Sequence, residues 1–274
     1  MTIKYNELYD KYKKKYLNLR TKINMLNAIE SIANNKSKTF EFVDIVLTKK
    51  EKITIKNLKI SHPNEFNYFG KINSDYLRSL IEDFFKLMDE HNESDVITNI
   101  LFDRIIKTYI NVNNADSLWL TIRASEPNTL YNVPRWHKDG YYFKIQEYGQ
   151  LDKYQLKMAG TLIGPGTMFK SDDPNLLKTL VELRRQHYRN FDFKNFDHDK
   201  DLKIRKIIDQ ELKNYEVVQP TKNQIAIFTV GSDNKSAVHS EPNIDKLRVF
   251  FSVIAGSEEE IKELAQRFGK QFLD

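Results

Sequence analysis

The sequence predicts a mixed α+β fold, and three observations support this class. Segments rich in β-branched and aromatic residues, bounded by glycine and proline, are typical of strands. Other segments place apolar residues three and four positions apart, which is typical of amphipathic helices. The chain has 274 residues, enough to bury a core without disulfides or a structural metal. We therefore expect one large domain with attached segments.

Residues 1–35 are expected to form an amphipathic helix, followed by the main domain at residues 36–274. The helix pattern matches coiled-coil heptads, which favours self-association or tethering, with packing on the main domain as the alternative. The run 11–17 resembles an N-terminal segment of giant DNA virus proteins, which implies a viral protein. The apolar residues recur at spacings of four and three: Tyr5, Tyr9, Tyr12, Tyr16, Leu19, Ile23 and Met25 with Leu26.

The next segments predict strands and then helices. Residues 39–47 and 53–60 are rich in β-forming residues, so we expect two strands around a turn at 49–52. Ser74 is the expected N-cap of a helix that runs to about residue 89, and a second helix is expected at 95–109. Both helices would cover the back of a sheet.

The second half of the chain supplies most of the expected sheet. Strands are predicted at 118–124, 155–163, 224–230 and 247–254, and a tight turn at 164–166. Charged helical patterns at 174–189 and 199–214 indicate an insertion at about 171–215 between strands. A C-terminal helix at 258–272 is expected to begin after Ser257 as N-cap, because acidic residues fill its first turn.

Composition limits the function classes. The 43 basic and 38 acidic residues give a net charge of +5, and cysteine is absent. This mixed charge does not by itself indicate nucleic-acid binding. The lack of cysteine excludes disulfides, zinc–thiolate sites and iron–sulfur clusters, which leaves His, Asp and Glu as strong metal ligands. No apolar run has the length of a membrane span. We expect a soluble intracellular protein, located in the cytoplasm of a host cell or in a virion.

Two short segments contain candidate metal ligands. His137 and Asp139 are two residues apart, so an extended backbone would point both side chains the same way. His239 stands before an apolar strand that carries Arg248, nine positions further on. Two histidines and one carboxylate with open positions are typical of non-haem Fe(II) sites. A guanidinium inside such a strand requires an anionic partner.

These four residues resemble the Fe(II)- and 2-oxoglutarate-dependent dioxygenases, whose double-stranded β-helix carries His-x-Asp, a distant His and a later Arg or Lys. The resemblance implies a jelly-roll, cupin-like core in which His137, Asp139 and His239 bind Fe(II) and Arg248 binds 2-oxoglutarate. It implies an O2-dependent hydroxylase that releases succinate and CO2, with ascorbate as a candidate reductant.

Three further residues are candidates for the cosubstrate site. Lys157 and Thr161 lie on the strand after the His-x-Asp pair, where family members often direct a polar residue towards 2-oxoglutarate. Some members carry a serine two residues after the arginine. Here Phe250 occupies that position and Ser252 lies two residues further, so Ser252 is the candidate in this chain.

The resemblance leaves the substrate open between a protein side chain and a small molecule. Collagen-type prolyl hydroxylases are a less direct match, because this chain has Arg instead of Lys at the cosubstrate position. A nucleic-acid dealkylase would carry a second arginine soon after the first, and residues 249–256 contain none. The alternatives are a catalytically inactive β-barrel that serves as an interaction module and a cupin-like iron enzyme that uses no keto acid.

Overall fold

The computed structural model describes residues 2–88, 93–144 and 154–274, without the side chains of residues 2–11 and Ser74. The described residues form a six-stranded and a three-stranded antiparallel sheet with helices packed around them. This arrangement confirms the expected mixture of helices and strands.

The six-stranded sheet is built mainly from strands that are distant in sequence. Its order is β1 (Phe40–Asp44), β7 (Gln224–Val230), β4 (Gln155–Ile163), β9 (Arg248–Gly256), β3 (Ser117–Ser125) and β2 (Asn64–Lys71).

The smaller sheet has the order β6 (Val217–Val218), β5 (Met168–Lys170) and β8 (His239–Ser240). An isolated bridge between His137 and His239 extends it by one residue pair. His137 and Asp139 were expected on an extended strand, and the backbone pairing there is limited to this bridge.

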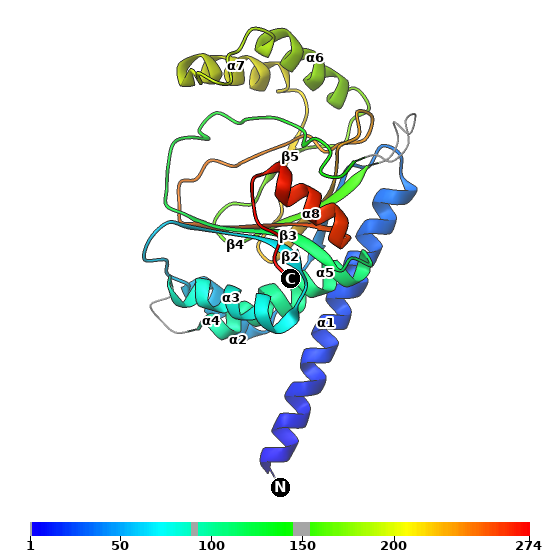
Figure 1. Cartoon of the computed structure of the whole chain (residues 1–274), viewed down its shortest axis with the longest axis vertical. Helices are drawn as coiled ribbons and strands as arrows, with labels where there is room; N and C mark the ends of the chain where they lie inside the picture. The colour runs from blue at the N-terminus through cyan, green and yellow to red at the C-terminus, as the bar shows by residue number, and fades with distance from the viewer. Residues whose placement is uncertain (1, 89–92, 145–153) are drawn as a thin grey trace.

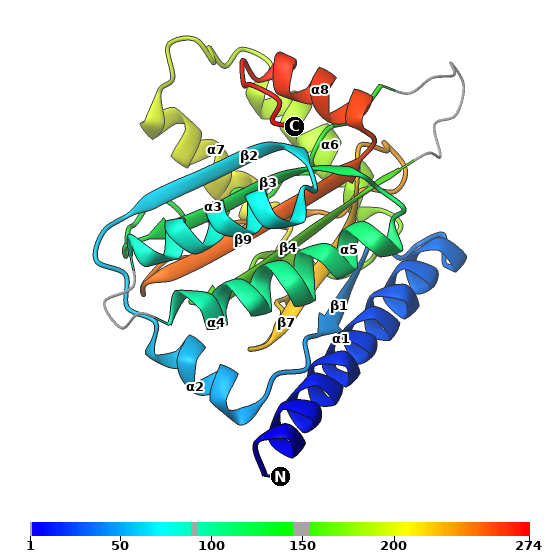
Figure 2. The same cartoon turned by 60° about the horizontal axis from the view of Figure 1, so that its bottom comes forward.

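One face of the large sheet is covered by the helices from the first half of the chain (Figure 2). They are α1 (Thr2–Asn34), α2 (Lys49–Asn57), α3 (Ser74–Lys86), α4 (Ser94–Thr98), the π-helix η1 (Asn99–Ile106) and α5 (Lys107–Val112). The last three are continuous in sequence, so the predicted helix at 95–109 is present, with a π-helical centre.

The central strands separate a helix-facing side from an opposite, polar side. On β9, Val249, Phe251 and Val253 are buried in the core beneath the helices. The alternate residues Arg248, Phe250 and Ser252 line a pocket on the other side of the sheet, as the period of two predicts. One strand therefore supports the core and the pocket at the same time.

The expected strand at 53–60 is wrong, because residues 49–57 form α2. Thr48 and Glu51 form a reciprocal capping box that satisfies the first backbone N–H groups of the helix. Glu51 also accepts two hydrogen bonds from the buried guanidinium of Arg104, at 2.7 and 2.9 Å. These local and tertiary bonds outweigh the β-propensity of the β-branched residues in this segment.

Two further expectations need correction. Strand β2 was not predicted, although it pairs with β3 along its whole length. The N-cap of α3 is Asn73 and Ser74 is the first helical residue. The predicted end of this helix, at residue 89, lies outside the described residues.

The expected C-terminal helix is present as α8 (Glu258–Arg267). Ser257 is its N-cap, as expected, with a complete capping box.

Helix α1 has two environments. Its second half buries Met25, Ala28 and Ile32 in the main core, next to β1 and α5. Its N-terminal turns extend away from the rest of the molecule (Figure 1). Among the described helices, none combines the length and the apolar character that crossing a membrane requires.

Helices α6 (Leu176–Tyr188) and α7 (His198–Glu211) lie at the opposite end from α2, α3 and α4 (Figure 1). Both predicted helices of the 171–215 segment are therefore present. They form a second apolar cluster together with Trp136 and Val238, so the residue next to His137 packs against them.

Candidate metal centre

The backbone brings the two distant histidines together. His137 and His239 exchange two backbone hydrogen bonds, each of 2.9 Å, and their ring centroids are 4.3 Å apart. Because the two backbones are paired, the main chain holds the two imidazole rings close to each other. Two residues a hundred positions apart thereby become neighbours.

Both rings are oriented by their Nδ1 atoms. Nδ1 of His137 lies 2.7 Å from the carbonyl oxygen of Arg135, and Nδ1 of His239 lies 3.1 Å from that of Ala237. A carbonyl only accepts, so each Nδ1 carries the hydrogen and each Nε2 keeps a lone pair. Both Nε2 atoms face Asp139, at 3.6 and 3.7 Å from its carboxylate oxygens.

These three side chains form a group that could hold a metal ion. Their ligand atoms all lie within 4.8 Å of one another. Burial and the nearby His239 lower the pKa of His137 to about 3, and burial also lowers the pKa of His239. Both imidazoles are therefore neutral at pH 7, which is the form that binds metals.

Asp139 is held by a cation and a phenol. Lys157 Nζ and the Tyr142 hydroxyl each donate to Asp139 Oδ2, at 2.8 Å. Burial alone would raise the pKa of Asp139, but Lys157 and the two histidines bring it well below its ordinary value. The carboxylate is therefore ionised, with Oδ1 directed to the His137 side.

The histidine and aspartate cluster lies in a pocket of about 210 Å³ between the two sheets. Phe228 and Phe169 pack beside the His239 ring, with centroids at 5.0 and 5.9 Å. Polar and charged groups from β3, β4, β8 and β9 complete the wall. The residues that line the pocket are Trp119, Thr121, Arg123, Arg135, His137, Asp139, Lys157, Ala159, Thr167, Phe228, His239, Glu241, Arg248, Phe250 and Ser252.

Arg248 is a buried cation in the wall of this pocket. It is 3% exposed, and its Nε donates to the carbonyl oxygen of Pro165 at 2.9 Å. Its guanidinium lies 4.6 Å from the Phe250 ring centroid, and its buried Nη2 has no hydrogen-bond partner. In the described part of the chain, no carboxylate is within ion-pair distance of this guanidinium.

The other sequence-predicted residues divide into two groups. Lys157 and Ser252 line the pocket with the His-Asp-His cluster. Thr161 is not among the lining residues; it pairs with Phe250 in the sheet, beyond Ala159. Thr161 lies on the same side of β4 as Lys157 and Ala159, but the pocket lining does not include it.

Sequence reasoning missed Glu241 and the part played by Tyr142. Glu241 pairs with Arg135 at 2.7 Å, and this ion pair joins the segment before His137 to the segment after His239. The same two-residue spacing that selected His137 and Asp139 also relates His239 to Glu241, so the signal was present. The contact from Tyr142 to Asp139 depends on a loop conformation that no periodicity encodes.

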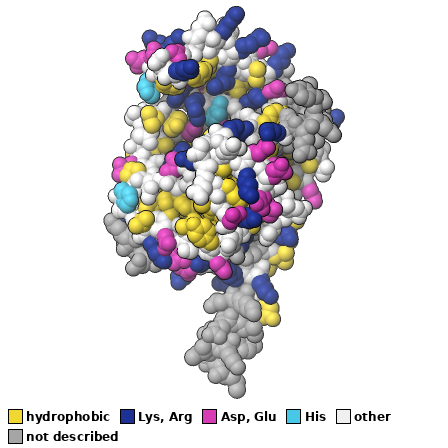
Figure 3. All heavy atoms as spheres, viewed as in Figure 1, with side chains coloured by type: hydrophobic (Ala, Val, Ile, Leu, Met, Phe, Trp, Pro, Cys, Tyr) yellow, Lys and Arg dark blue, Asp and Glu magenta, His cyan; other side chains and the backbone are white. Residues whose placement is uncertain are grey.

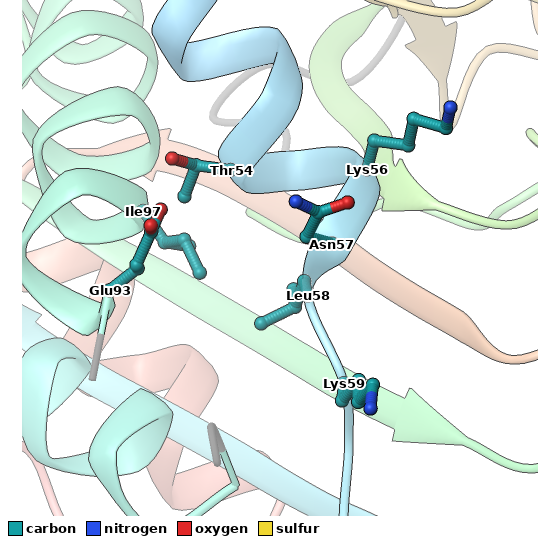
Figure 4. Close-up of a pocket in the computed structure, with 7 residues that line it drawn as sticks. All are labelled: Thr54, Lys56, Asn57, Leu58, Lys59, Glu93 and Ile97. Carbon is teal, nitrogen blue, oxygen red and sulfur yellow. The ribbon is translucent and has the colours of Figure 1, made fainter. Parts of the chain in front are cut away.

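A larger cavity, of about 540 Å³, lies between α2 and α4 (Figure 4). Its single lining carboxylate, Glu93, is accompanied by Lys56 and Lys59 and by no histidine. The larger cavity is therefore not the one that contains the candidate metal ligands. Within the described residues, His137, Asp139 and His239 are the group with metal-ligand geometry.

No protein-family model matches the sequence, and no curated protein matches it. Among solved structures, the chain is similar to a prolyl-4-hydroxylase of Pseudomonas putida, with TM-score 0.34 and 8% identity over 84% of this chain and 98% of that one. It is also similar to the dioxygenase for auxin oxidation of rice, with TM-score 0.44 and 7% identity over 89% and 90%.

A third similar structure is the Kdo hydroxylase, a non-haem Fe(II) 2-oxoglutarate-dependent dioxygenase, in complex with cobalt(II). The TM-score is 0.35, with 13% identity over 88% of this chain and 90% of that one. At these TM-scores and identities, a functional conclusion has to rest on the residues of the pocket itself.

Proposed function

We propose that this protein is an Fe(II)- and 2-oxoglutarate-dependent oxygenase that hydroxylates a C–H bond of a protein side chain or a small molecule and releases succinate and CO2. One observation carries the proposal. Two neutral imidazoles and an ionised carboxylate converge within 4.8 Å, in a pocket that also contains the buried guanidinium of Arg248, whose Nη2 has no hydrogen-bond partner among the described residues.

The donor set fits Fe(II). His137 and His239 would bind through Nε2, because Nδ1 of each is engaged with a carbonyl oxygen. Asp139 would bind through Oδ1, since Oδ2 is held by Lys157 and Tyr142. Two histidines and one carboxylate leave open positions on such an ion. When bound, Fe(II) and 2-oxoglutarate would supply the activation of O2 and the oxidation of the C–H bond.

Arg248 fits the far carboxylate of 2-oxoglutarate. A buried guanidinium is costly unless it is paired, and an arginine fork matches a carboxylate with two parallel hydrogen bonds. The unpartnered Nη2 of Arg248 is available for such a bond. Ser252 and Thr121, on paired positions of β9 and β3, line the same pocket and could complete the carboxylate site.

Lys157 has two roles in this proposal, one towards Asp139 and one towards the cosubstrate. Its ammonium holds Asp139 ionised and fixes the orientation of the carboxylate, so it acts as a positioning residue for a metal ligand. It also lines the pocket, where it would attract the negatively charged cosubstrate.

The architecture supports the same proposal. Two antiparallel sheets with the pocket between their residues are consistent with a double-stranded β-helix, the double-sheet jelly roll of the cupins. We propose residues 36–274 as the oxygenase domain, with 171–215 as its helical insertion. The insertion reaches the site through Trp136, whose Nε1 donates to Asp209 at 2.7 Å.

The test is an anaerobic titration of the protein with Fe(II) and then 2-oxoglutarate. A weak visible charge-transfer band is expected, and it should be absent in His137→Ala. Metal binding without a response to 2-oxoglutarate would indicate an iron enzyme that uses no keto acid. If the wild-type protein shows neither metal binding nor a response to 2-oxoglutarate, the result would indicate an interaction module. Succinate formation across peptide, nucleotide and small-molecule pools would then identify the substrate.

A further inference from the structure

Helix α1 carries an exposed apolar stripe that is separate from its buried face. Tyr12, Tyr16, Leu19 and Ile23 are 62%, 54%, 56% and 42% exposed. Their spacings of four, three and four define a narrow seam of a and d positions, as in a coiled coil. We call these four residues the α1 seam. The opposite face of the helix packs into the protein core.

The α1 seam continues in the sequence in both directions. Tyr5 and Tyr9 precede it and Leu26 follows it with unbroken heptad spacing. In this register Tyr9, Tyr16 and Ile23 occupy a positions, and the other members occupy d positions. In the described part of the helix, Tyr12, Tyr16, Leu19 and Ile23 follow one line along α1, whose first turns extend from the body (Figure 1).

The positions beside the α1 seam are basic. Lys13 and Arg20 occupy the e positions, Lys15 and Lys22 occupy g positions, and all four are exposed. Residues 12–27 contain no acidic residue. Basic and hydrophobic side chains lie together where α1 leaves the body in Figure 3. The e and g residues decide partner choice in a coiled coil.

This charge pattern disfavours a second copy of the chain as the partner. In a parallel pair, Lys15 of one helix would face Arg20 of the other. In an antiparallel pair, e positions face e positions and g positions face g positions, so lysine or arginine again faces lysine or arginine. Like charges at these positions destabilise the pair. Self-association through α1 therefore lacks the charge complementarity that it needs.

A second group of basic residues lies where α1 faces the body of the protein. A groove of about 380 Å³ between α1 and α2 is lined by Lys13, Lys14, Lys49 and Lys50. Lys14 has Asp103 at 3.4 Å, and Lys49 and Lys50 are exposed. Lys13 also flanks the α1 seam, whereas Lys14 lies on the side of α1 that faces the body, so a helix on the seam would meet the basic residues of α1 and not those of α2.

We propose that the α1 seam is the docking site for an acidic amphipathic helix of another protein, with apolar residues at its a and d positions and Glu or Asp at its e and g positions. The narrow seam fits a coiled-coil partner better than a lipid surface, which is bound through a wider apolar face. This docking site is independent of the pocket that contains His137.

The test uses the full-length protein and a labelled synthetic peptide of about four heptads with Leu at a and d and Glu at every e and g position. A matched peptide carries Lys at the same e and g positions. Fluorescence anisotropy should show binding of the Glu peptide only. Its affinity should fall about tenfold or more between about 0.05 M and 0.5 M NaCl, because salt screens exposed charges.

Two sets of variants separate the apolar and the charged contributions to peptide binding. Leu19→Glu with Ile23→Glu should abolish peptide binding. The triple charge reversal Lys15→Glu, Arg20→Glu and Lys22→Glu should weaken the Glu peptide about tenfold or more and create binding of the Lys peptide. Thermal melting verifies that each variant is folded.

A second triple reversal provides the control for net charge. Lys178→Glu, Lys203→Glu and Lys206→Glu, at exposed positions of α6 and α7, changes the net charge equally and should leave peptide binding unchanged. Four results would overturn the proposal. They are equal binding of both peptides, binding of neither, a protein dimer in sedimentation that Leu19→Glu dissociates, and binding to phosphatidylserine vesicles without binding of the Glu peptide.

Discussion

Replacing Arg248 with methionine should weaken 2-oxoglutarate binding without weakening the fold. Methionine has nearly the same length as the arginine stem but lacks the guanidinium. Arg248 is 3% exposed, and burial lowers its pKa to about 10, so the side chain is still charged at pH 7. The variant therefore removes one buried charge and little volume.

The expected loss of 2-oxoglutarate affinity is estimated from the cost of removing the buried guanidinium that would pair with the carboxylate. Removing one partner of a buried, hydrogen-bonded charge pair costs about 2 to 5 kcal/mol of binding energy. A loss of about 3 kcal/mol corresponds to roughly a hundredfold rise in the Kd for 2-oxoglutarate. In the absence of 2-oxoglutarate, the unpaired charge is itself unfavourable, so Arg248→Met should be at least as stable as the wild type.

The assay is the anaerobic titration of 2-oxoglutarate into the Fe(II)-loaded protein, with thermal unfolding of the protein alone beside it. Arg123→Met is the matched control, because Arg123 lines the same pocket but is 44% exposed and paired with Glu65. It should change the Kd only a few-fold at most. An unchanged Kd in a folded Arg248→Met protein would refute the assignment of Arg248 to the cosubstrate.

Three further predictions concern the fold. Glu51→Ala should destabilise the protein by about 3 to 5 kcal/mol in urea unfolding, because it leaves the Arg104 guanidinium buried without its acid. Burial alone would raise the pKa of Glu51, but Arg104 and the Thr48 backbone lower it below the ordinary 4.5. The stability from this pair is therefore present above about pH 4.5 and is lost as the pH falls through the folded-state pKa; a wild-type stability that is flat from pH 6 to about pH 3 would contradict this. Ser257→Ala should cost about 1 kcal/mol through the lost cap of α8, whereas Asn73→Ala should cost much less, because Asn73 makes no side-chain cap hydrogen bond; equal losses in melting temperature would count against the capping argument. Gly164→Ala should destabilise by about 1 to 3 kcal/mol, because Gly164 has φ of +86° and an added Cβ would lie 2.9 Å from Arg248 Cα. The same variant should weaken 2-oxoglutarate binding, and a wild-type Kd would show that the turn does not position Arg248.

The sequence predicts the local elements and the identity of the clustered residues well. Strand β4 begins and ends where the pattern places it, and α8 begins after Ser257. The convergence of His137, Asp139 and His239 was also expected, from the two-residue spacing of the first pair, the place of His239 before the Arg248 strand, and the resemblance to the Fe(II)- and 2-oxoglutarate-dependent dioxygenases. Alternation on β9 correctly placed Arg248, Phe250 and Ser252 on one face.

The failures have physical causes. Residues 53–60 contain β-branched residues, but the stronger signal lies upstream, where Thr48 and Glu51 stand at capping-box spacing. Strand β2 lies at the edge of the sheet and is specified by its pairing with β3, which is not encoded locally. The contacts of Lys157 and Tyr142 with Asp139 likewise depend on residues that meet only after the chain has folded.

The pairing of β5 with β6 has a practical consequence. Lys170 and Val217 lie opposite each other in the small sheet, so the segment between them leaves and re-enters the fold at one point. We expect that residues 171–216 can be replaced by a segment of different length and sequence without moving His137 and His239. Any replacement would need to supply an apolar cover and a hydrogen-bond acceptor for the indole of Trp136.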